Sequence, residues 1–208
     1  MNKYTIIAVM GQSGAGKDSF AKAFEKRFPS CNPIRTCTTR PIRDYEQNGI
    51  DYHFLTNDEF SQKLILNNMV EATVFNEWCY GTSFDHLLKD KVNIGVFNPT
   101  AVEILKENRQ INLITIYITA SDKVRLLRQL NREENPDCDE IVRRYTADQK
   151  DFSATHINFI HPDFIVRNNG EYSIEEVVDD FLNKYTDSIN CQLAVNGIGL
   201  NYMLGKND

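Results

Sequence analysis

A short glycine-rich segment near the start of this chain stands between a predicted strand and a predicted helix. Residues 4–10 form an apolar run, residues 11–19 read GQSGAGKDS, and helical spacing follows from Ala21. Glycines free backbone amides to surround a phosphate chain, the following helix N-terminus favours negative charge, and a lysine after the last glycine reaches the β- and γ-phosphates. The segment therefore predicts a strand, loop and helix that bind a nucleoside triphosphate.

The residue after the lysine departs from the usual form of such a loop. Asp18 occupies the position where a hydroxyl normally binds magnesium, and the next hydroxyl belongs to Ser19. Two interpretations stay open: Asp18 is an acid that the helix dipole favours in a first turn, or its carboxylate binds the Mg²⁺ that accompanies ATP. The predicted ATP contacts of the loop are Gly11, Ser13, Gly14, Ala15, Gly16, Lys17, Asp18 and Ser19.

Length and charge limit the classes of protein to consider. A chain of 208 residues suits one domain with small inserted parts, and a net charge of -6 argues against a general nucleic-acid binder, which needs an excess of Lys and Arg. The five cysteines show no CxxC spacing, so they indicate neither a zinc site nor a disulfide framework. No apolar stretch approaches the roughly 18 residues of a membrane span, and the N-terminal run is too short for a signal peptide. We expect a cytoplasmic protein with no nucleic-acid or membrane partner.

Apolar runs alternate with helical periodicity along most of the chain, which indicates an α/β fold with a parallel sheet and crossover helices. Helix starts are predicted at Ser121 and at two capping boxes, Thr56 with Glu59 and Ser173 with Glu176. The predicted buried strands are residues 4–10, 93–97, 111–118 and 163–167.

Three segments differ from this alternation. Residues 35–82 contain short β-rich pieces and predict a small subdomain inserted beside the main sheet. The polar stretch 130–140 predicts a mobile flap, and residues from about 187 onward carry no readable pattern. The arginines that flank the flap are Arg125, Arg128, Arg132, Arg143 and Arg144.

The β-rich insert carries a second candidate site. Arg40 and Arg43 lie three residues apart, and Tyr52 and Tyr80 follow in neighbouring pieces. Guanidinium groups match phosphate oxygens and phenol hydroxyls add donors, so these four side chains could clamp one phosphate. Taken singly, the arginines would be solvated turn residues and the tyrosines packing residues. Their combination with a triphosphate loop favours the phosphate clamp.

In this order the motifs resemble a guanylate kinase, a nucleoside monophosphate kinase that transfers a phosphoryl group from ATP to GMP or dGMP. The resemblance extends over residues 4–185. The matching pieces are GQSGAGKDS at 11–19, TCTTRPIR at 36–43, GIDYHF at 49–54, Glu71, YGTS at 80–83, the flap with its arginines, and a strand that ends in Asn168.

The resemblance implies a P-loop fold of three layers and a role for each matching residue. Residues 1–34 and 93–186 would form the kinase core with a helical lid at about 128–145, residues 35–92 the monophosphate-binding subdomain, and residues 187–208 a tail of unknown role. The implied catalytic residues are Lys17, Arg43, Arg132 and Arg144. Arg132 and Asn168 would also contact the adenine of ATP. The implied acceptor contacts are Thr36, Arg40, Arg43, Tyr52, Glu71, Tyr80, Gly81, Thr82 and Asn98.

Two positions break the family pattern. The family carries two aspartates near the end of the strand before the helix at 99–108, and this chain has Val96 and Asn98 there. Loss of the first aspartate suggests that Asp18 replaces its carboxylate at the metal. The Asn98 carbonyl oxygen could accept from guanine beside Glu71, but its amide could equally serve another base.

Other functions therefore stay open on the sequence. A nucleoside monophosphate kinase with another base preference, or a sugar-phosphate kinase, is one alternative. A guanylate-kinase-like module that binds phosphorylated protein segments without catalysis is another, although the complete loop favours an enzyme. The sequence indicates no oligomeric state.

Overall fold

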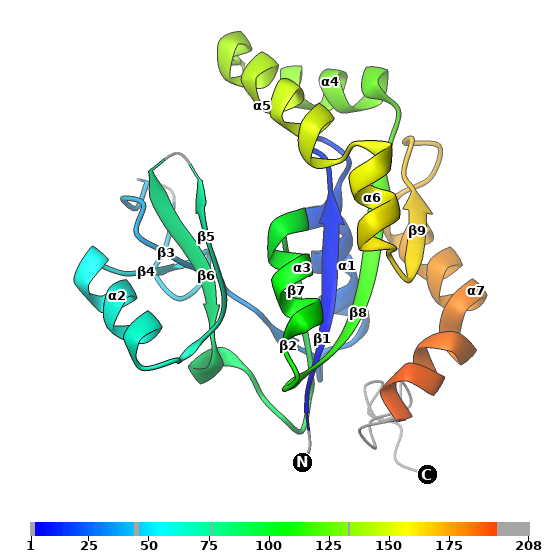
Figure 1. Cartoon of the computed structure of the whole chain (residues 1–208). Helices are drawn as coiled ribbons and strands as arrows, with labels where there is room; N and C mark the ends of the chain where they lie inside the picture. The colour runs from blue at the N-terminus through cyan, green and yellow to red at the C-terminus, as the bar shows by residue number, and fades with distance from the viewer. Residues whose placement is uncertain (1–2, 44–45, 76, 133, 195–208) are drawn as a thin grey trace.

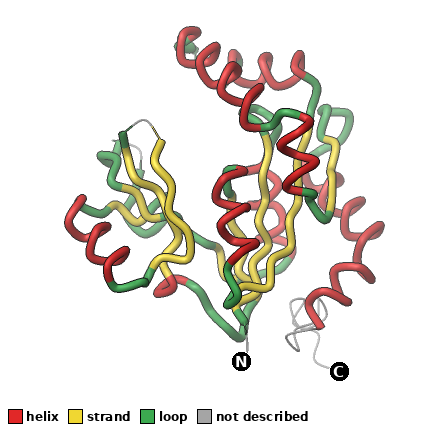
Figure 2. Tube along the Cα trace, in the orientation of Figure 1, coloured by secondary structure: helices red, strands yellow, loops and turns green. Residues whose placement is uncertain are grey.

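The computed structural model describes residues 3–43, 46–75, 77–132 and 134–194 of the chain. These residues form two separate sheets, a five-stranded and a four-stranded one. Figures 1 and 2 show the smaller sheet standing to one side of the larger sheet, which lies between helices. The predicted α/β class is confirmed.

The larger sheet is parallel throughout and has the strand with the apolar run of residues 4–10 at its centre. All four predicted buried strands lie in it, with ends that differ from the prediction by at most one residue. Its order is β2 (Asn32–Pro33), β7 (Val92–Val96), β1 (Tyr4–Gly11), β8 (Ile111–Thr119) and β9 (Phe164–Arg167).

Helices cover both faces of this sheet because its strands are apolar on both sides. In β1, Ile7 belongs to one buried cluster with Phe20 and Phe181, whereas Ile6 belongs to a second cluster with Val102. Successive strand residues point to opposite faces, so one apolar run supplies both clusters. The helices are α1 (Lys17–Arg27) and α7 (Ile174–Ala194) on the first face, and α3 (Pro99–Glu107) and α6 (Ala154–Ile160) on the second.

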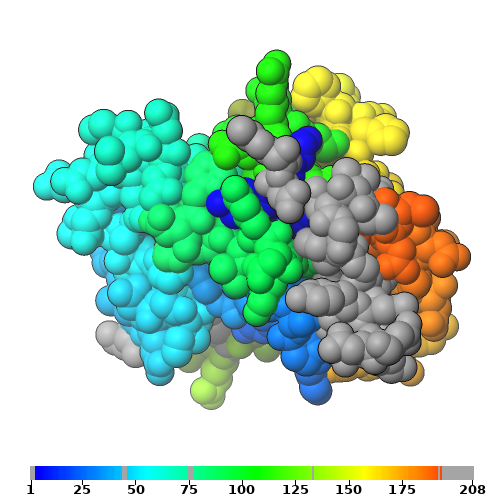
Figure 3. Space-filling model, turned by 90° about the horizontal axis from the view of Figure 1, so that it is seen from below, coloured from blue at the N-terminus to red at the C-terminus, as the bar shows by residue number. Residues whose placement is uncertain are grey.

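The smaller sheet is formed entirely by the inserted segment and is mainly antiparallel. Its helix α2 (Asn57–Ile65) begins at the predicted capping box, in which Thr56 and Glu59 bond each other's backbone N–H groups. Seen from below, the insert lies on the opposite side of the molecule from α7 (Figure 3). Its strands are β4 (His53–Phe54), β3 (Cys37–Thr38), β6 (Trp78–Ser83) and β5 (Met69–Phe75), and η1 (Phe84–His86) follows them.

The flap region consists of two helices, α4 (Asp122–Leu130) and α5 (Cys138–Asp151). Both lie beyond the carboxyl ends of the central strands, on the side where the glycine-rich loop leaves β1 (Figure 1). The carboxyl ends of parallel strands are where open α/β sheets bind ligands, so this arrangement locates the candidate site.

The predicted tail is helical in its first part. Helix α7 continues through Ala194, and Ile189 and Leu193 are buried against the core. Residues 195–208 of the predicted tail lie outside the described residues. Among the described residues, none of the helices combines the length and the apolar character needed to cross a membrane. All five cysteines lie in the described part of the chain and are free thiols.

Candidate active site

The glycine-rich loop has the backbone geometry of an anion-binding turn. Gly14 and Gly16 both have positive φ angles, 77° and 95°, which side-chain-bearing residues rarely adopt. Gly16 is also the N-cap of α1, and the helix starts at Lys17 without a side-chain cap. The first amides of a helix lack intrahelical partners, so this end of α1 is suited to receive a phosphate.

Asn168 contacts the outside of this loop. Its amide Nδ2 donates to the carbonyl of Ala15 at 2.9 Å, and its Oδ1 accepts from Arg128 at 3.2 Å. A Cβ atom on Gly16 would lie 2.4 Å from Asn168 Nδ2, so the close approach also requires glycine there. The predicted adenine contact is thus a residue that supports the loop backbone.

Asp18 lies between the loop lysine and the insert. Its carboxylate is 3.4 Å from Lys17 Nζ, and its side chain is 70% exposed. Burial raises the pKa of Tyr52, and the negative charge of Asp18 raises it further. Among the residues that the structure describes, no group of three or more His, Cys, Asp or Glu side chains could hold a metal ion alone. A cation here would therefore need oxygen ligands from a bound nucleotide besides Asp18.

The predicted phosphate clamp is partly assembled on the small sheet. The Arg40 guanidinium lies 5.5 Å from the centre of the Tyr52 ring and 5.6 Å from that of Phe54. Tyr52 and Tyr80 meet edge to face, with ring centres 6.4 Å apart. Three of the four predicted side chains are therefore neighbours, and Arg43 follows Arg40 on the exposed side of the same loop.

Glu46 is a residue of this cluster that the sequence interpretation missed. It receives two bonds from Arg40, at 2.8 and 3.0 Å, and a third from the Arg43 backbone N–H at 2.9 Å. These bonds, that of the Arg40 side chain first, lower the pKa of Glu46. Its position three residues after Arg43 was the available signal, because a carboxylate at that distance can close a turn around two arginines.

A buried carboxylate forms the other end of the insert site. Glu71 is 5% exposed and accepts a bond of 2.9 Å from the Thr82 hydroxyl, which is fully buried. Burial raises the pKa of Glu71 to about 7, whereas the Thr82 bond lowers it. Gly81 permits the close pairing of these strands, since a Cβ there would lie 2.6 Å from the Glu71 carbonyl oxygen. Thr36 lies just before β3, where its carbonyl accepts from the His53 N–H at 3.0 Å.

The two positions that break the family pattern have structural partners. Val96 is partly buried and packs against the apolar cluster on the α1 face. The Asn98 Oδ1 accepts from the Ala101 N–H at 2.7 Å as the N-cap of α3, and its Nδ2 donates to Thr73 Oγ1 at 3.4 Å. The Asn98 oxygen therefore has a partner already, and the amide faces the insert.

The arginines of the flap fall into two groups. Arg132 is exposed, and Arg144 is 41% exposed and donates to Glu140 at 2.7 Å. Bonds from Arg143 and Arg144 lower the pKa of Glu140 to about 2. Arg125, by contrast, is fully buried against the phosphate loop. Arg125 flanks the flap in the sequence, but its side chain bonds Ser13 of the loop, Asp148 and the nearby Asp122.

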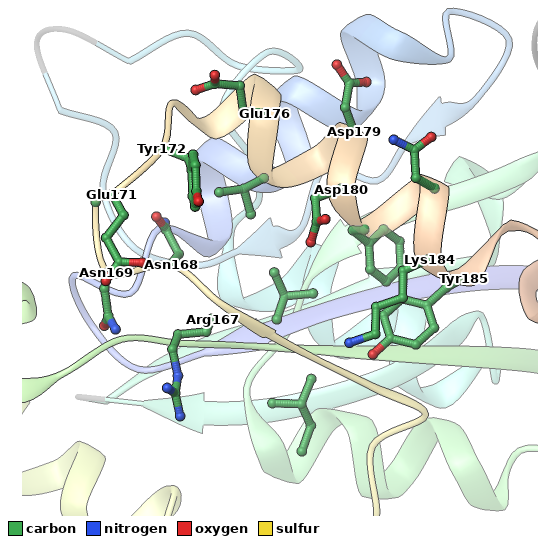
Figure 4. A pocket seen from close by; sticks show the side chains of 16 residues that line it. Arg167, Asn168, Asn169, Glu171, Tyr172, Glu176, Asp179, Asp180, Lys184 and Tyr185 are labelled. Atoms are coloured by element: carbon green, nitrogen blue, oxygen red, sulfur yellow. The ribbon is translucent and has the colours of Figure 1, made fainter.

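A cavity lies elsewhere, between β9 and α7. It measures about 700 Å³, and its lining includes Arg167 of β9 and, from α7, Asp180 and Lys184, all labelled in Figure 4. Asn168 is the one predicted site residue in its lining. Because the loop glycines, Lys17 and the insert do not line it, this cavity is not the place where the two candidate nucleotide sites meet.

Comparisons with known proteins point to one family. The family model described as guanylate kinase matches residues 3–185. The chain is 31% identical over 174 residues to the guanylate kinase of Wigglesworthia glossinidia brevipalpis, covering 81% of this chain and 82% of that protein. It is 30% identical over 182 residues to the guanylate kinase of Thermotoga maritima, covering 85% of each.

A solved structure supports the fold. The crystal structure of guanylate kinase from Anaplasma phagocytophilum superposes with a TM-score of 0.59 at 19% sequence identity, covering 98% of this chain and 95% of that one. At that identity the likeness concerns the fold alone. The overall fold is therefore one that this chain shares with a solved guanylate kinase structure.

Proposed function

The chain belongs to the guanylate kinase family, and from this premise we propose that it transfers the γ-phosphoryl group of ATP to GMP or dGMP. The products would be ADP and GDP or dGDP. One observation carries the proposal: a glycine-rich loop followed by Lys17 lies across from an insert that holds both an arginine–tyrosine cluster and the buried Glu71–Thr82 pair. A non-catalytic module would need only the second half of this arrangement.

The insert would bind the acceptor at two ends. Arg40, Arg43, Tyr52 and Tyr80 would hold its phosphate, because guanidinium and phenol groups supply the donors that phosphate oxygens accept. Glu71 would accept from the N1–H and the exocyclic amine of guanine, with Thr36, Gly81 and Thr82 beside it. A buried carboxylate suits guanine because adenine offers no pair of donors on that edge.

The core would hold the donor and stabilise the charge that moves. Loop amides from Gly11 to Ser19 and Lys17 would bind the ATP phosphates, and Arg132, Arg144 and Asn168 would approach from the lid and from β9. Phosphoryl transfer needs positioned cations and an in-line acceptor oxygen more than it needs a general base. Closing the lid and insert would exclude water, which would otherwise accept the phosphoryl group. The domain division at residues 35–92 and the lid at about 128–145 are part of this proposal.

Kinases of this family use Mg²⁺ with ATP, and Asp18 is the residue of this chain that we assign to it. Its exposed carboxylate is an oxygen donor of the kind that Mg²⁺ prefers, and it follows the loop lysine directly. When bound, Mg²⁺ neutralises the phosphate oxygens. We expect Asp18→Ala to lower kcat about 100-fold and Asp18→Ala with Val96→Asp to regain part of that loss. No recovery in the double variant would count against the replacement of one carboxylate by the other.

A panel of nucleoside monophosphates with ATP and Mg²⁺ tests the proposed function. ADP release should be fastest with GMP and dGMP, and Lys17→Ala protein purified in parallel gives the background of contaminating kinases. Faster turnover of AMP, CMP or dTMP would reassign the base preference. GMP binding without ATP consumption would favour the non-catalytic module. A cytoplasmic location remains a prediction from the sequence.

A further inference from the structure

The carbonyl groups of the phosphate loop are bonded from outside the loop. Ser13 O accepts from Arg125 Nε at 3.1 Å, Gly14 O from Arg128 Nη1 at 3.2 Å, and Ala15 O from Asn168 Nδ2 at 2.9 Å. The C=O and N–H of a trans peptide point in opposite directions. Holding the Ser13 and Ala15 carbonyls outside therefore turns the N–H groups of Gly14 and Gly16 toward the inside of the loop, where a phosphate binds.

Arg125 and Asp148 bond the two peptide groups that flank Ser13, one on each side. Arg125 Nη2 donates to Asp148 Oδ2 at 2.9 Å, and that same oxygen accepts from the Ser13 N–H at 2.7 Å. Arg125 comes from α4 and Asp148 from α5, so the two helices of the flap meet the loop at one point. A Cβ on Gly14 would lie 2.4 Å from the Arg125 carbonyl oxygen, which shows how closely α4 packs on the loop.

Arg125 is not arranged to bind a phosphate itself. Its side chain is fully buried, and its charge is balanced by Asp148 and by Asp122, which accepts from Nη1 at 2.8 Å. The Tyr145 ring covers the guanidinium, with its centre 5.5 Å away. Removing one partner of such a buried pair strands the other charge, whereas replacing both with apolar residues is often neutral for stability.

The contact at Asp148 also sets the position of a lid arginine. Glu140, Arg144 and Asp148 follow one another at intervals of four residues on α5, so they share one face of the helix. Glu140 bonds Arg144. With Asp148 anchored on Ser13, Arg144 stands one helical turn above the loop, in the direction from which the lid would reach the donor phosphates.

We infer that Arg125 and Asp148 are positioning residues for the donor site. They fix the two peptide groups that flank Ser13 so that the loop amides converge, and they anchor α5 so that Arg144 faces the transferred group. The claim about Arg144 and the transferred group rests on the proposed kinase function. The claim about the loop amides concerns only the binding of the triphosphate.

Asp148→Asn removes the negative charge of the side chain that bonds Ser13 and Arg125, with little change in its shape. We expect the affinity for a non-hydrolysable ATP analogue and kcat/KM for ATP each to fall at least about tenfold, because small displacements of positioned groups have large effects on rate. GMP affinity should stay within about twofold, since the bonds of this pair among the described residues go to the loop and the flap helices. Asp122→Asn is the matched control, because Asp122 bonds the same arginine but not the loop. In this variant the analogue affinity and kcat/KM for ATP should stay within about threefold of the parent.

The double variant Arg125→Met with Asp148→Leu separates positioning from folding. Its melting temperature should remain close to that of the parent because no buried charge is left unpaired, yet its affinity for the ATP analogue should fall like that of Asp148→Asn. A folded double variant with the parent's analogue affinity and kcat would overturn the inference. If the parent phosphorylates no monophosphate, the proposed function fails, but analogue binding to these variants still decides whether the pair positions the loop.

Discussion

The two halves of the proposed site are built over very different distances along the chain. On the donor side, Ser13 bonds Asp148 135 positions away and Ala15 bonds Asn168 153 positions away. On the acceptor side, Glu46 bonds Arg40 six positions away, and Thr82 bonds Glu71 eleven positions away. The proposed acceptor residues are thus held by contacts between near neighbours within the insert. The donor loop is held instead by side chains from the flap helices and from the end of the edge strand β9.

This difference suggests that the two ligands can be perturbed separately. Short-range contacts within the insert form without the core, whereas the loop peptides hold their directions only when α4, α5 and β9 are packed around them. A substitution in the insert should therefore change the affinity for the monophosphate alone. A substitution at the loop should change the binding and turnover of ATP alone.

Lys17→Ala should give the largest loss. Without the ammonium group beside the β- and γ-phosphates, we expect kcat to fall at least about 1000-fold, because a lost electrostatic contact to a transferring phosphoryl group weakens the transition state most. GMP affinity measured by calorimetry should change less than about twofold. Lys22→Ala, at an exposed position on the same helix, is the control that should behave like the parent. A parental rate in Lys17→Ala would contradict the donor assignment.

Glu71 should make monophosphate binding dependent on pH. Burial raises its pKa to about 7 in the free protein, so below pH 7 it carries a proton and cannot accept both guanine donors. We expect KM for GMP to rise about tenfold from pH 8 to pH 6, while KM for ATP stays nearly constant.

The Glu71→Gln variant checks the cause of that pH dependence. Its KM for GMP should be about 100-fold above that of the parent, because one guanine donor then faces an amide group, and it should vary little between pH 6 and pH 8. A variant that kept the parent's pH profile would show that another group is titrating.

Glu46→Gln should have a smaller effect on the same ligand. The carboxylate orients Arg40 through two charge-assisted bonds, and an amide can accept only one of them. KM for GMP should rise about tenfold with little change in KM for ATP. Asp58→Asn, on the exposed side of α2, is the control. Tighter GMP binding in Glu46→Gln would instead mean that Glu46 competes with the phosphate for Arg40.

The smallest effect concerns the thiol within the acceptor segment. Cys37 is fully buried, and burial raises its pKa to about 11, so almost none of it is the reactive thiolate at pH 8. Iodoacetamide should label the exposed Cys138 and Cys191 first and leave GMP turnover nearly unchanged. Peptide mapping by mass spectrometry checks the order, and early labelling of Cys37 would indicate that the insert opens.

Local signals in the sequence predicted local structure well. The capping boxes at Thr56 and Ser173 both form as expected, since each joins residues three positions apart. The apolar runs became strands of the parallel sheet because burial on both faces requires such runs. Glu46 shows the opposite case. Its spacing from the two arginines was visible in the sequence, but an acid among exposed residues gives no sign that its carboxylate is buried.

Long-range contacts limited the prediction of the donor side. Arg125 and Arg128 resembled the other arginines around the flap, yet Arg125 is fully buried and both bond the loop backbone. Nothing in the spacing of the arginines distinguishes one that meets a carboxylate 23 positions away from one that faces solvent. Asn168 likewise matched a family motif for adenine, and its contact with Ala15 became visible only when β9 was placed beside the loop.

By itself, the sequence determined the main strands of the parallel sheet, the phosphate loop and the family, because these depend on periodicity and on residues close together in the chain. Only the tertiary structure decided which charged side chains hold the loop and which remain exposed for substrates. The physical reason is that burial gives a charge its role: the same guanidinium is a structural anchor when carboxylates and peptide groups enclose it, and a ligand for phosphate when it faces the open site.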